Sequence, residues 1–263
     1  MTVHASWLIT GAGGSIGRCL AEGLRDVVSH LVLTDARIDS STEFQVEPLN
    51  ILDRNALVEA FQGIDGVIHL AAISDEADFD ELTEVNILGT RNVLEAARKA
   101  RVRRVVYASS NRLTGFWPSN QEIDVHVAVR PDGFYGVSKA AAEALGRLYS
   151  DKFKLEFVAV RIGTFLEKPQ NSRHLSTWLS ARDCVAAFRS AMFAPIDGFA
   201  SFYAVSNNTR RWWSLEDGRL LGFIPIDDAE QFADEFSDKS IPFDLQGGSF
   251  TTPEFSLLRQ RDS

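Results

Sequence analysis

The stretch that decides the fold runs from residue 7 to residue 17 and reads Trp-Leu-Ile-Thr-Gly-Ala-Gly-Gly-Ser-Ile-Gly. A short apolar run is followed here by four glycines within seven residues, and apolar residues then recur every three or four positions. This order predicts a buried strand, a tight turn and a helix. A glycine-rich turn lets the backbone approach a pyrophosphate and places that group at the positive end of the helix. The residues that we predict to bind a dinucleotide here are Gly11, Gly14, Ser15, Ile16 and Gly17.

Strands and helices alternate after this turn. Apolar runs typical of buried strands cover residues 31–35, 67–70, 105–108 and 157–162. Helical periodicity covers residues 53–62, 82–99 and 135–153, between those runs. Such alternation predicts an α/β fold built on a doubly wound parallel sheet, the Rossmann arrangement. We therefore predict that residues 1–162 form a nucleotide-binding core.

The last 101 residues lack this regular alternation. They contain a helical stretch at 182–193, an apolar run at 202–205 and loops rich in aromatic residues. We interpret residues 163–263 as a substrate-side cap that packs on the core, so that both parts form one compact unit. A chain of 263 residues can bury such a core without disulfides or a structural metal.

The composition, with 45% hydrophobic and 24% charged residues, is that of an ordinary globular protein and excludes wholesale disorder. The net charge at pH 7 is −9, and no block of Lys or Arg is present. We therefore expect neither nucleic-acid binding nor docking on an anionic membrane. A basic leader followed by a long apolar segment is absent from the sequence, so a cytoplasmic location is expected.

The residues that most often bind metals are scattered. Cys19 and Cys184 lie far apart in the sequence, and no Cys-x-x-Cys pair occurs. The five histidines lack a ligand spacing such as His-x-x-x-His. We therefore predict neither a disulfide framework nor a metal site.

An acidic residue, Asp35, ends the second predicted strand, 18 positions after Gly17. A carboxylate at this place accepts hydrogen bonds from the adenosine ribose and repels the 2′-phosphate of NADP. Arg37, two positions later, is a cation that would instead favour that phosphate. We predict that Asp35 binds the cofactor and that NAD is preferred over NADP.

A second set of polar residues predicts catalysis. Ser110 follows a predicted strand, and Tyr135 and Lys139 are four positions apart at the start of a predicted helix, so they project from one face. A phenol with a pKa near ~10 is a poor base at neutral pH. An adjacent ammonium and a positive nicotinamide would stabilise its phenolate, so we predict that Lys139 lowers the pKa of Tyr135.

These motifs resemble those of the extended short-chain dehydrogenase/reductase family. The residues behind this resemblance are Thr10-Gly-x-x-Gly14-x-x-Gly17, His69-Leu-Ala-Ala72, Asn86, Ser110 and Tyr135-x-x-x-Lys139. Further stretches are similar to bacterial uronate dehydrogenases, and all the matches together run from about Leu8 to Phe255. They are Ala108-Ser-Ser-Asn111, Arg130-Pro-Asp-Gly-x-Tyr135, Val160-Arg-Ile-Gly163, Arg173-x-Leu-Ser-Thr-Trp178, Trp212-Trp213 and Gln246-Gly-Gly-x-Phe250.

The resemblance implies NAD-dependent oxidation of a hexuronate at its anomeric carbon, C1, to the aldaro-lactone. It implies that Tyr135 removes the C1 hydroxyl proton, that Ser110 hydrogen-bonds the same oxygen and that Lys139 holds the nicotinamide ribose. Further cofactor contacts are implied for Leu52, Asp53, Ala71 and Ala72. The sugar would be surrounded by Ser74, Ser110, Asn111, Thr164 and Arg173, with Arg173 on its carboxylate.

Two positions depart from the pattern of the uronate dehydrogenases. Position 164 is Thr instead of Ser, which keeps the hydroxyl, and position 112 is Arg instead of His. As a second cation at the sugar, Arg112 would tighten carboxylate binding or suit a more highly charged sulfonate or phosphate. Alternatively, Arg112 is exposed to solvent or paired with a carboxylate such as Glu122 or Asp124.

Other functions use similar residues. A sugar-nucleotide epimerase or dehydratase shares the Ser/Tyr/Lys set, although its C-terminal part is usually longer than the 101 residues found here. A non-catalytic NAD-binding regulator would lack the Tyr or the Lys, and both are present. By analogy with the superfamily, the helices predicted over 82–99 and 135–153 imply a homo-oligomer.

Overall fold

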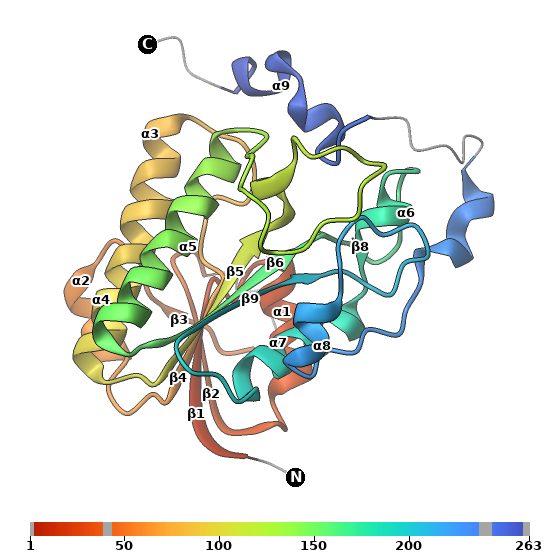
Figure 1. Cartoon of the computed structure of the whole chain (residues 1–263). Coiled ribbons are helices and arrows are strands. Elements are labelled where there is room, and N and C mark those ends of the chain that lie inside the picture. Colours follow the sequence, from red (N-terminus) through yellow and green to blue (C-terminus); the bar gives the residue numbers. More distant parts are fainter. Residues whose placement is uncertain (1–2, 39–43, 237–243, 260–263) are drawn as a thin grey trace.

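Seven parallel strands form the central sheet of the computed structural model, which describes residues 3–38, 44–236 and 244–259 (Figure 1). The strands are β1 (Val3–Thr10), β2 (Val28–Asp35), β3 (Glu47–Pro48), β4 (Gly66–His69), β5 (Arg104–Ser110), β6 (Glu156–Ile162) and β9 (Phe199–Ala204). Their order across the sheet is β3-β2-β1-β4-β5-β6-β9, and each adjacent pair is parallel. The winding direction changes between β1 and β4, which confirms the predicted doubly wound sheet. In such sheets a ligand binds at this switch point, beyond the carboxyl ends of the strands.

Helices cover both faces of the sheet (Figure 1). On one face lie α1 (Ser15–Leu24) and α7 (Ala181–Phe193), and on the other lie α2 (Arg54–Ala60), α4 (Gly89–Ala100) and α5 (Phe134–Phe153). Because both faces are covered, every residue of β4 and β5 is buried. None of the helices in the described ranges is long and apolar enough to cross a membrane.

The helix predicted over residues 82–99 is present, but it is not regular. It begins as α3 (Phe79–Leu82), continues through a π-helical segment, η1 (Thr83–Leu88), and ends as α4. Single π-helical turns of this kind are frequent at functional sites. The Asn86 side chain in η1 bonds the backbone of Ile73 and donates to the hydroxyl of Ser138 in α5. This segment therefore links the loop after β4 to the helix that carries Tyr135 and Lys139.

The core layers continue beyond residue 162, into the part of the chain that we interpreted as a cap. β9 pairs in parallel with β6, and α7 packs against α1. Without β9, the buried strand β6 would be an exposed edge of the sheet. The remaining elements are η2 (Asn111–Thr114), β7 (Thr164–Phe165), α6 (His174–Thr177), β8 (Trp178–Leu179), α8 (Glu216–Leu220), η3 (Ala229–Glu235), η4 (Gly248–Thr251) and α9 (Pro253–Leu257).

The two cysteines, which lie far apart in the sequence, come close together in the fold. Because α1 packs on α7, the Cys19 thiol lies 3.6 Å from the carbonyl oxygen of Ala181 and in hydrogen-bond contact with Cys184. Both thiols are free. The contact is therefore part of the packing between the two helices on this face.

Candidate functional site

The glycine-rich turn joins β1 to α1 as predicted. Gly11 adopts a left-handed conformation with φ of 77°, and a Cβ on it would lie 2.6 Å from the backbone nitrogen of Ala71. Only glycine fits there. A Cβ on Gly17 would similarly lie 2.5 Å from the carbonyl oxygen of Ala12. The glycines thus let two backbone segments approach each other at the end of β1.

The N-terminus of α1 has no side-chain cap of its own. Its N-cap residue is Gly14, and no acidic residue lies in its first turn. The first amide groups of a helix need acceptors, and a pyrophosphate supplies them. The turn therefore fits the diphosphate of a dinucleotide, with Ser15 and Ile16 in the first turn of the helix.

Asp35 lies at the end of β2, directly beside this turn. One oxygen of its carboxylate accepts a hydrogen bond from the backbone of Gly13 at 2.9 Å, and the other accepts one from the backbone of Arg37 at 2.9 Å. Each oxygen retains a lone pair for a further donor, such as a ribose hydroxyl. The Arg37 side chain is exposed.

The other predicted cofactor residues lie at the same edge of the sheet. Ala71 and Ala72 follow β4, and the Ala71 amide approaches the Thr10 hydroxyl at 3.4 Å. Leu52 and Asp53 precede α2, where one oxygen of Asp53 caps the helix by accepting from the backbone of Asn55 and Ala56. Asp53 thus has a structural role that the sequence analysis did not assign to it.

The structure brings Ser110, Tyr135 and Lys139 together. Ser110 ends β5, and Tyr135 and Lys139 lie in the first two turns of α5. The Tyr135 hydroxyl is in hydrogen-bond contact with Ser110, and Lys139 Nζ lies 5.7 Å from the centre of the Tyr135 ring. Lys139 Nζ also donates to the carbonyl oxygen of Ala108 at 2.8 Å.

Burial is the main cause of the pKa shifts of Tyr135 and Lys139. It raises the pKa of Tyr135 to about 12, although Ser110 and Arg112 act in the opposite direction. Burial also lowers the pKa of Lys139 to about 7. Removal from water destabilises both charged forms, so burial outweighs the nearby charges in the protein without its cofactor. That Lys139, together with a bound nicotinamide, lowers the pKa of Tyr135 stays a prediction.

A buried ion pair between α5 and β6 was not predicted. Arg161 on β6 donates two hydrogen bonds to the Glu143 carboxylate on α5, at 2.8 and 3.0 Å, and Ser109 donates to the same carboxylate at 2.5 Å. These bonds fix α5 against β5 and β6. No sequence signal marks the pair, because its partners are far apart in the chain.

The predicted acid-binding residue, Arg173, is buried, and its guanidinium is only partly engaged. Its Nε and Nη2 donate to the carbonyl oxygen of Gln246 at 3.0 and 2.7 Å. Within the described part of the chain no carboxylate forms an ion pair with Arg173. Burial lowers the pKa of Arg173 to about 10, which leaves it protonated at neutral pH.

The other residues predicted to surround the sugar differ in exposure. Asn111 is buried beside Ser110, and Ser74 is exposed. Thr164 is half-buried and shares a 2.8 Å hydrogen bond with the hydroxyl of Thr177. Their contacts with a sugar remain predictions.

Arg112 is fully engaged, but not with the carboxylates that we named. Its Nε bonds Asp132, its Nη1 donates to Asp75 at 3.3 Å and its Nη2 donates to Glu76 at 3.4 Å. The expected partners, Glu122 and Asp124, are wrong, because tertiary folding brings three other carboxylates to this buried guanidinium. One of them, Asp132, has its pKa raised by burial to about 6.

The Phe250 ring lies between the guanidinium groups of Arg112 and Arg173 and contacts both. Its ring centre lies 4.0 Å from the Arg112 guanidinium and 5.4 Å from that of Arg173. The Arg112 guanidinium also lies 5.5 Å from the centre of the Tyr135 ring. Arg173 is therefore on the same side of the molecule as Tyr135, the predicted catalytic tyrosine.

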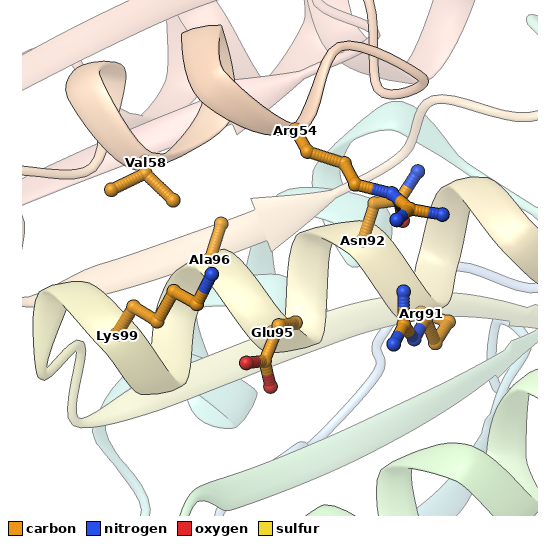
Figure 2. A pocket seen from close by; sticks show the side chains of 7 residues that line it. All are labelled: Arg54, Val58, Arg91, Asn92, Glu95, Ala96 and Lys99. Atoms are coloured by element: carbon orange, nitrogen blue, oxygen red, sulfur yellow. Dashed lines mark hydrogen bonds between the residues drawn. The ribbon is translucent and has the colours of Figure 1, made fainter.

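A separate pocket lies between α2 and α4, as Figure 2 shows. It is lined by Arg54, Val58, Arg91, Asn92, Glu95, Ala96 and Lys99. None of the predicted site residues is among them. This pocket is distinct from the site at the carboxyl ends of the strands.

The structure has the features of a dinucleotide-dependent enzyme of the Rossmann class. These are a doubly wound parallel sheet, a glycine turn without a side-chain cap beside Asp35, and the Ser110, Tyr135 and Lys139 side chains at one edge of the sheet. Residues 7–192 match the NAD dependent epimerase/dehydratase family. The protein belongs to this family, as the sequence motifs predicted.

Relatives with known activities refine this comparison. The chain is 35% identical over 254 residues to a uronate dehydrogenase of Pseudomonas syringae pv. tomato, which covers 92% of both chains. It is 32% identical to an NAD-dependent glucose-6-phosphate dehydrogenase of Haloferax volcanii, over 87% of this chain and 95% of that one. The structure of a mutant uronate dehydrogenase from Agrobacterium tumefaciens complexed with NAD superposes with a TM-score of 0.88, at 35% identity, over 95% of this chain and 97% of that one. The predicted fold, NAD cofactor and NAD-dependent sugar dehydrogenase activity agree with these relatives.

Proposed function

We propose that this protein oxidises a hexuronate, such as glucuronate or galacturonate, at C1 to the aldaro-lactone with NAD. The observation that supports an acidic substrate best is the buried Arg173 guanidinium, which has no ion-pair partner in the described part of the chain. The negative charge of Asp132 stabilises this guanidinium only from beyond ion-pair distance. A substrate carboxylate would compensate the buried charge directly. The similarity to uronate dehydrogenases supports the same substrate class.

Arg173 would bind the C6 carboxylate through one edge of its guanidinium. Gln246 occupies the edge formed by Nε and Nη2, so the edge formed by Nη1 and the second Nη2 proton is left for two parallel hydrogen bonds. Ser74, Asn111 and Thr164 would contact the hydroxyl groups of the sugar. This anchoring would orient the ring and bring C1 to Tyr135.

Tyr135 would accept the proton of the C1 hydroxyl, and Ser110 would hydrogen-bond the same oxygen. NAD, when bound, accepts the hydride from C1, and its positive nicotinamide favours the phenolate. Lys139 would hold the nicotinamide ribose. The glycine turn would hold the pyrophosphate and Asp35 the adenosine ribose, while Leu52, Asp53, Ala71 and Ala72 would line the rest of the cofactor groove.

The ion pairs of Arg112 favour a substrate with a carboxylate at C6 over one with a sulfonate or phosphate. Three carboxylates already engage its guanidinium, so it is not a second free cation for a sulfonate or phosphate. A glucose-6-phosphate dehydrogenase among the relatives keeps the 6-phospho sugar as the alternative to be tested.

The test is a substrate panel with NAD that contains glucuronate, galacturonate, glucose 6-phosphate, a 6-sulfo sugar and glucose. We expect stoichiometric NADH formation, measured by absorbance, with the two uronates and little with the others. NADH formation with only the 6-phospho or 6-sulfo sugar would overturn the uronate assignment. Turnover of a nucleotide sugar without NADH accumulation would indicate an epimerase or dehydratase instead.

We propose, in addition, that the protein works in the cytoplasm as a homo-oligomer that associates through η1, α4 and α5. Support comes from exposed apolar side chains on η1 and α5, namely Leu88, Val137, Leu148 and Phe153. Exposed apolar surface of this kind is buried when a second copy binds. Light scattering of the protein and of Leu148→Glu tests the proposal: the variant should have a lower mass than the unchanged protein, and equal monomer masses would contradict it.

A further inference from the structure

Glu76 is a buried carboxylate in the loop after β4, and neither the sequence motifs nor the proposed chemistry assigns it a role. It accepts hydrogen bonds from three separate segments of the chain. Oε1 accepts from the Phe134 amide at 2.8 Å and from the Ser256 hydroxyl at 3.1 Å. Oε2 accepts from the Tyr135 amide at 3.1 Å and from Arg112 Nη2 at 3.4 Å.

Glu76 takes the place of a capping side chain for α5. The N-cap residue of this 20-residue helix is Gly133, which has no side chain to bond the first amides. Glu76 reaches those amides from another segment, and its negative charge faces the positive end of the helix. A Cβ on Gly133 would lie 2.4 Å from Oε2, so the glycine leaves room for the carboxylate.

This cap acts directly on the catalytic tyrosine. The Tyr135 amide is one of the two amides that Glu76 binds, and Tyr135 is the second residue of the helix. The backbone position at residue 135 sets where the phenol lies relative to Ser110. The Glu76 bonds therefore help to fix that geometry.

The same carboxylate binds the end of the chain. We call residues 248–259, which contain η4 and α9, the C-terminal segment; Figure 1 shows α9 beside the loops near the start of α5. Ser256 in this segment donates to Glu76. Phe250 and Phe255 pack edge to face with ring centres 4.8 Å apart, and both lie over the guanidinium of Arg112, which also bonds Glu76.

We propose that Glu76 is a positioning residue that couples the C-terminal segment to the catalytic tyrosine. Each oxygen of its carboxylate binds one amide in the first turn of α5, and the same two oxygens bind Ser256 and Arg112, which hold the C-terminal segment in place. Release of the segment would therefore loosen the first turn of α5. This inference rests on the proposed function only through the role of Tyr135, because the coupling itself is a property of the unliganded protein.

The first experiment measures the coupling without catalysis. Amide hydrogen exchange is compared among the unchanged protein, Ser256→Ala and the control Ser249→Ala, whose exposed serine lies in the same segment. We expect Ser256→Ala to speed exchange about 3- to 10-fold both in the C-terminal segment and at the amides of residues 134 and 135. Ser249→Ala should change neither. Faster exchange in the C-terminal segment alone would overturn the coupling.

The second experiment measures turnover on the uronate that the panel identifies. Glu76→Gln keeps the size of the side chain but loses the charge and one acceptor, so we expect kcat to fall roughly 10- to 100-fold with little change in KM or in the Kd for NAD. Ser256→Ala should lower kcat about 3- to 10-fold, and it should have no further effect in the Glu76→Gln background, because both act through one carboxylate.

The outcomes separate this inference from the proposed function. If Glu76→Gln merely lowers the Tm while kcat per folded molecule is unchanged, Glu76 is structural and the proposal is wrong. If the effects of the two substitutions multiply, they act independently and the coupling is also wrong. If the unchanged protein forms no NADH on any uronate, the proposed function fails, while the exchange experiment still decides the coupling.

Discussion

Arg112 and Arg173, two buried arginines on the predicted substrate side, differ in the groups that surround them. Arg112 bonds three carboxylates, whereas Arg173 has two of its donors on one backbone carbonyl and no ion-pair partner in the described part of the chain. The sequence pointed to Arg173 as the partner of the substrate carboxylate, but it left open whether Arg112 is a second cation at the sugar or is paired with a carboxylate of the protein. The carboxylates of Asp75, Glu76 and Asp132 reach Arg112 only after the chain has folded.

Replacement of Arg173 tests the acid group of the substrate. Arg173→Ala should lower kcat/KM for a uronate by roughly thirty- to several-thousand-fold, because the substrate carboxylate would be left without a partner, a loss on the order of 2–5 kcal/mol. A neutral sugar such as glucose should lose far less. Steady-state kinetics on both sugars give the comparison, and equal losses would assign Arg173 a structural role.

Replacement of Tyr135 tests the proton acceptor. Tyr135→Phe should lower kcat at least roughly a hundredfold and leave the Kd for NAD nearly unchanged, because the hydroxyl is lost while the cofactor-binding turn is intact. Single-turnover rates and NAD titration provide the two measurements. A variant that keeps more than about a tenth of the turnover would rule out Tyr135 as the base.

Cofactor choice should depend on Asp35. Its carboxylate would accept hydrogen bonds from the ribose diol, and like charge would repel the 2′-phosphate of NADP. We expect kcat/KM to favour NAD over NADP by about two orders of magnitude, and Asp35→Ala to remove most of that preference. Equal values for the two cofactors in the unchanged protein would mean that the exposed Arg37 faces the ribose instead.

At the scale of helices and strands, a feature could be predicted from the sequence when the residues that cause it are close together in the chain. The turn before α1 was predictable, because its glycines are close together and their spacing has a direct steric reason. The start of α5 was also predictable, but its cap was not. The N-cap residue, Gly133, has no side chain, and the first amides of the helix are bound instead by Glu76, 57 positions before Gly133. The spacing of apolar residues in the sequence indicates neither the π-helical segment within the predicted helix over 82–99 nor the contact of this segment with α5.

A methyl group at position 133 tests this remote cap. Gly133→Ala would place its Cβ 2.4 Å from Glu76 Oε2 and displace the carboxylate from the helix end. The backbone at Gly133 is extended, so the substitution adds no backbone strain of its own. We expect the free energy of unfolding to fall by about 1–3 kcal/mol, measured by urea denaturation, together with a lower kcat. Unchanged stability and turnover would mean that Glu76 is not needed at the helix end.

At the scale of the whole molecule, the two parts that the sequence separates are joined by one sheet. β9 completes the sheet beside β6, and the first turn of α7 lies against Cys19 of α1. The pattern of the first 162 residues is regular because consecutive strands and helices pack on one another. Contacts made by the later residues are long-range, so their place in the core could not be read from periodicity.

The dependence of global stability on pH should reflect the buried Lys139. Its pKa in the folded protein is lowered to about 7 from an ordinary value of 10.5, because burial destabilises the ammonium. Between these two values the unfolded chain holds a proton that the folded protein does not, so stability should rise as the pH increases from 7 towards 10. Lys139→Met removes this titration, and it should therefore be more stable than the unchanged protein at pH 7, by on the order of 2–4 kcal/mol, with a difference that shrinks as the pH rises.

Lys152→Met, at an exposed lysine of the same helix, is the matched control, and its stability difference from the unchanged protein should not change with pH in this way. Urea denaturation from pH 6.5 to 9.5 measures all three proteins, and a difference for Lys139→Met that stays constant over this range would mean that Lys139 remains charged inside the fold.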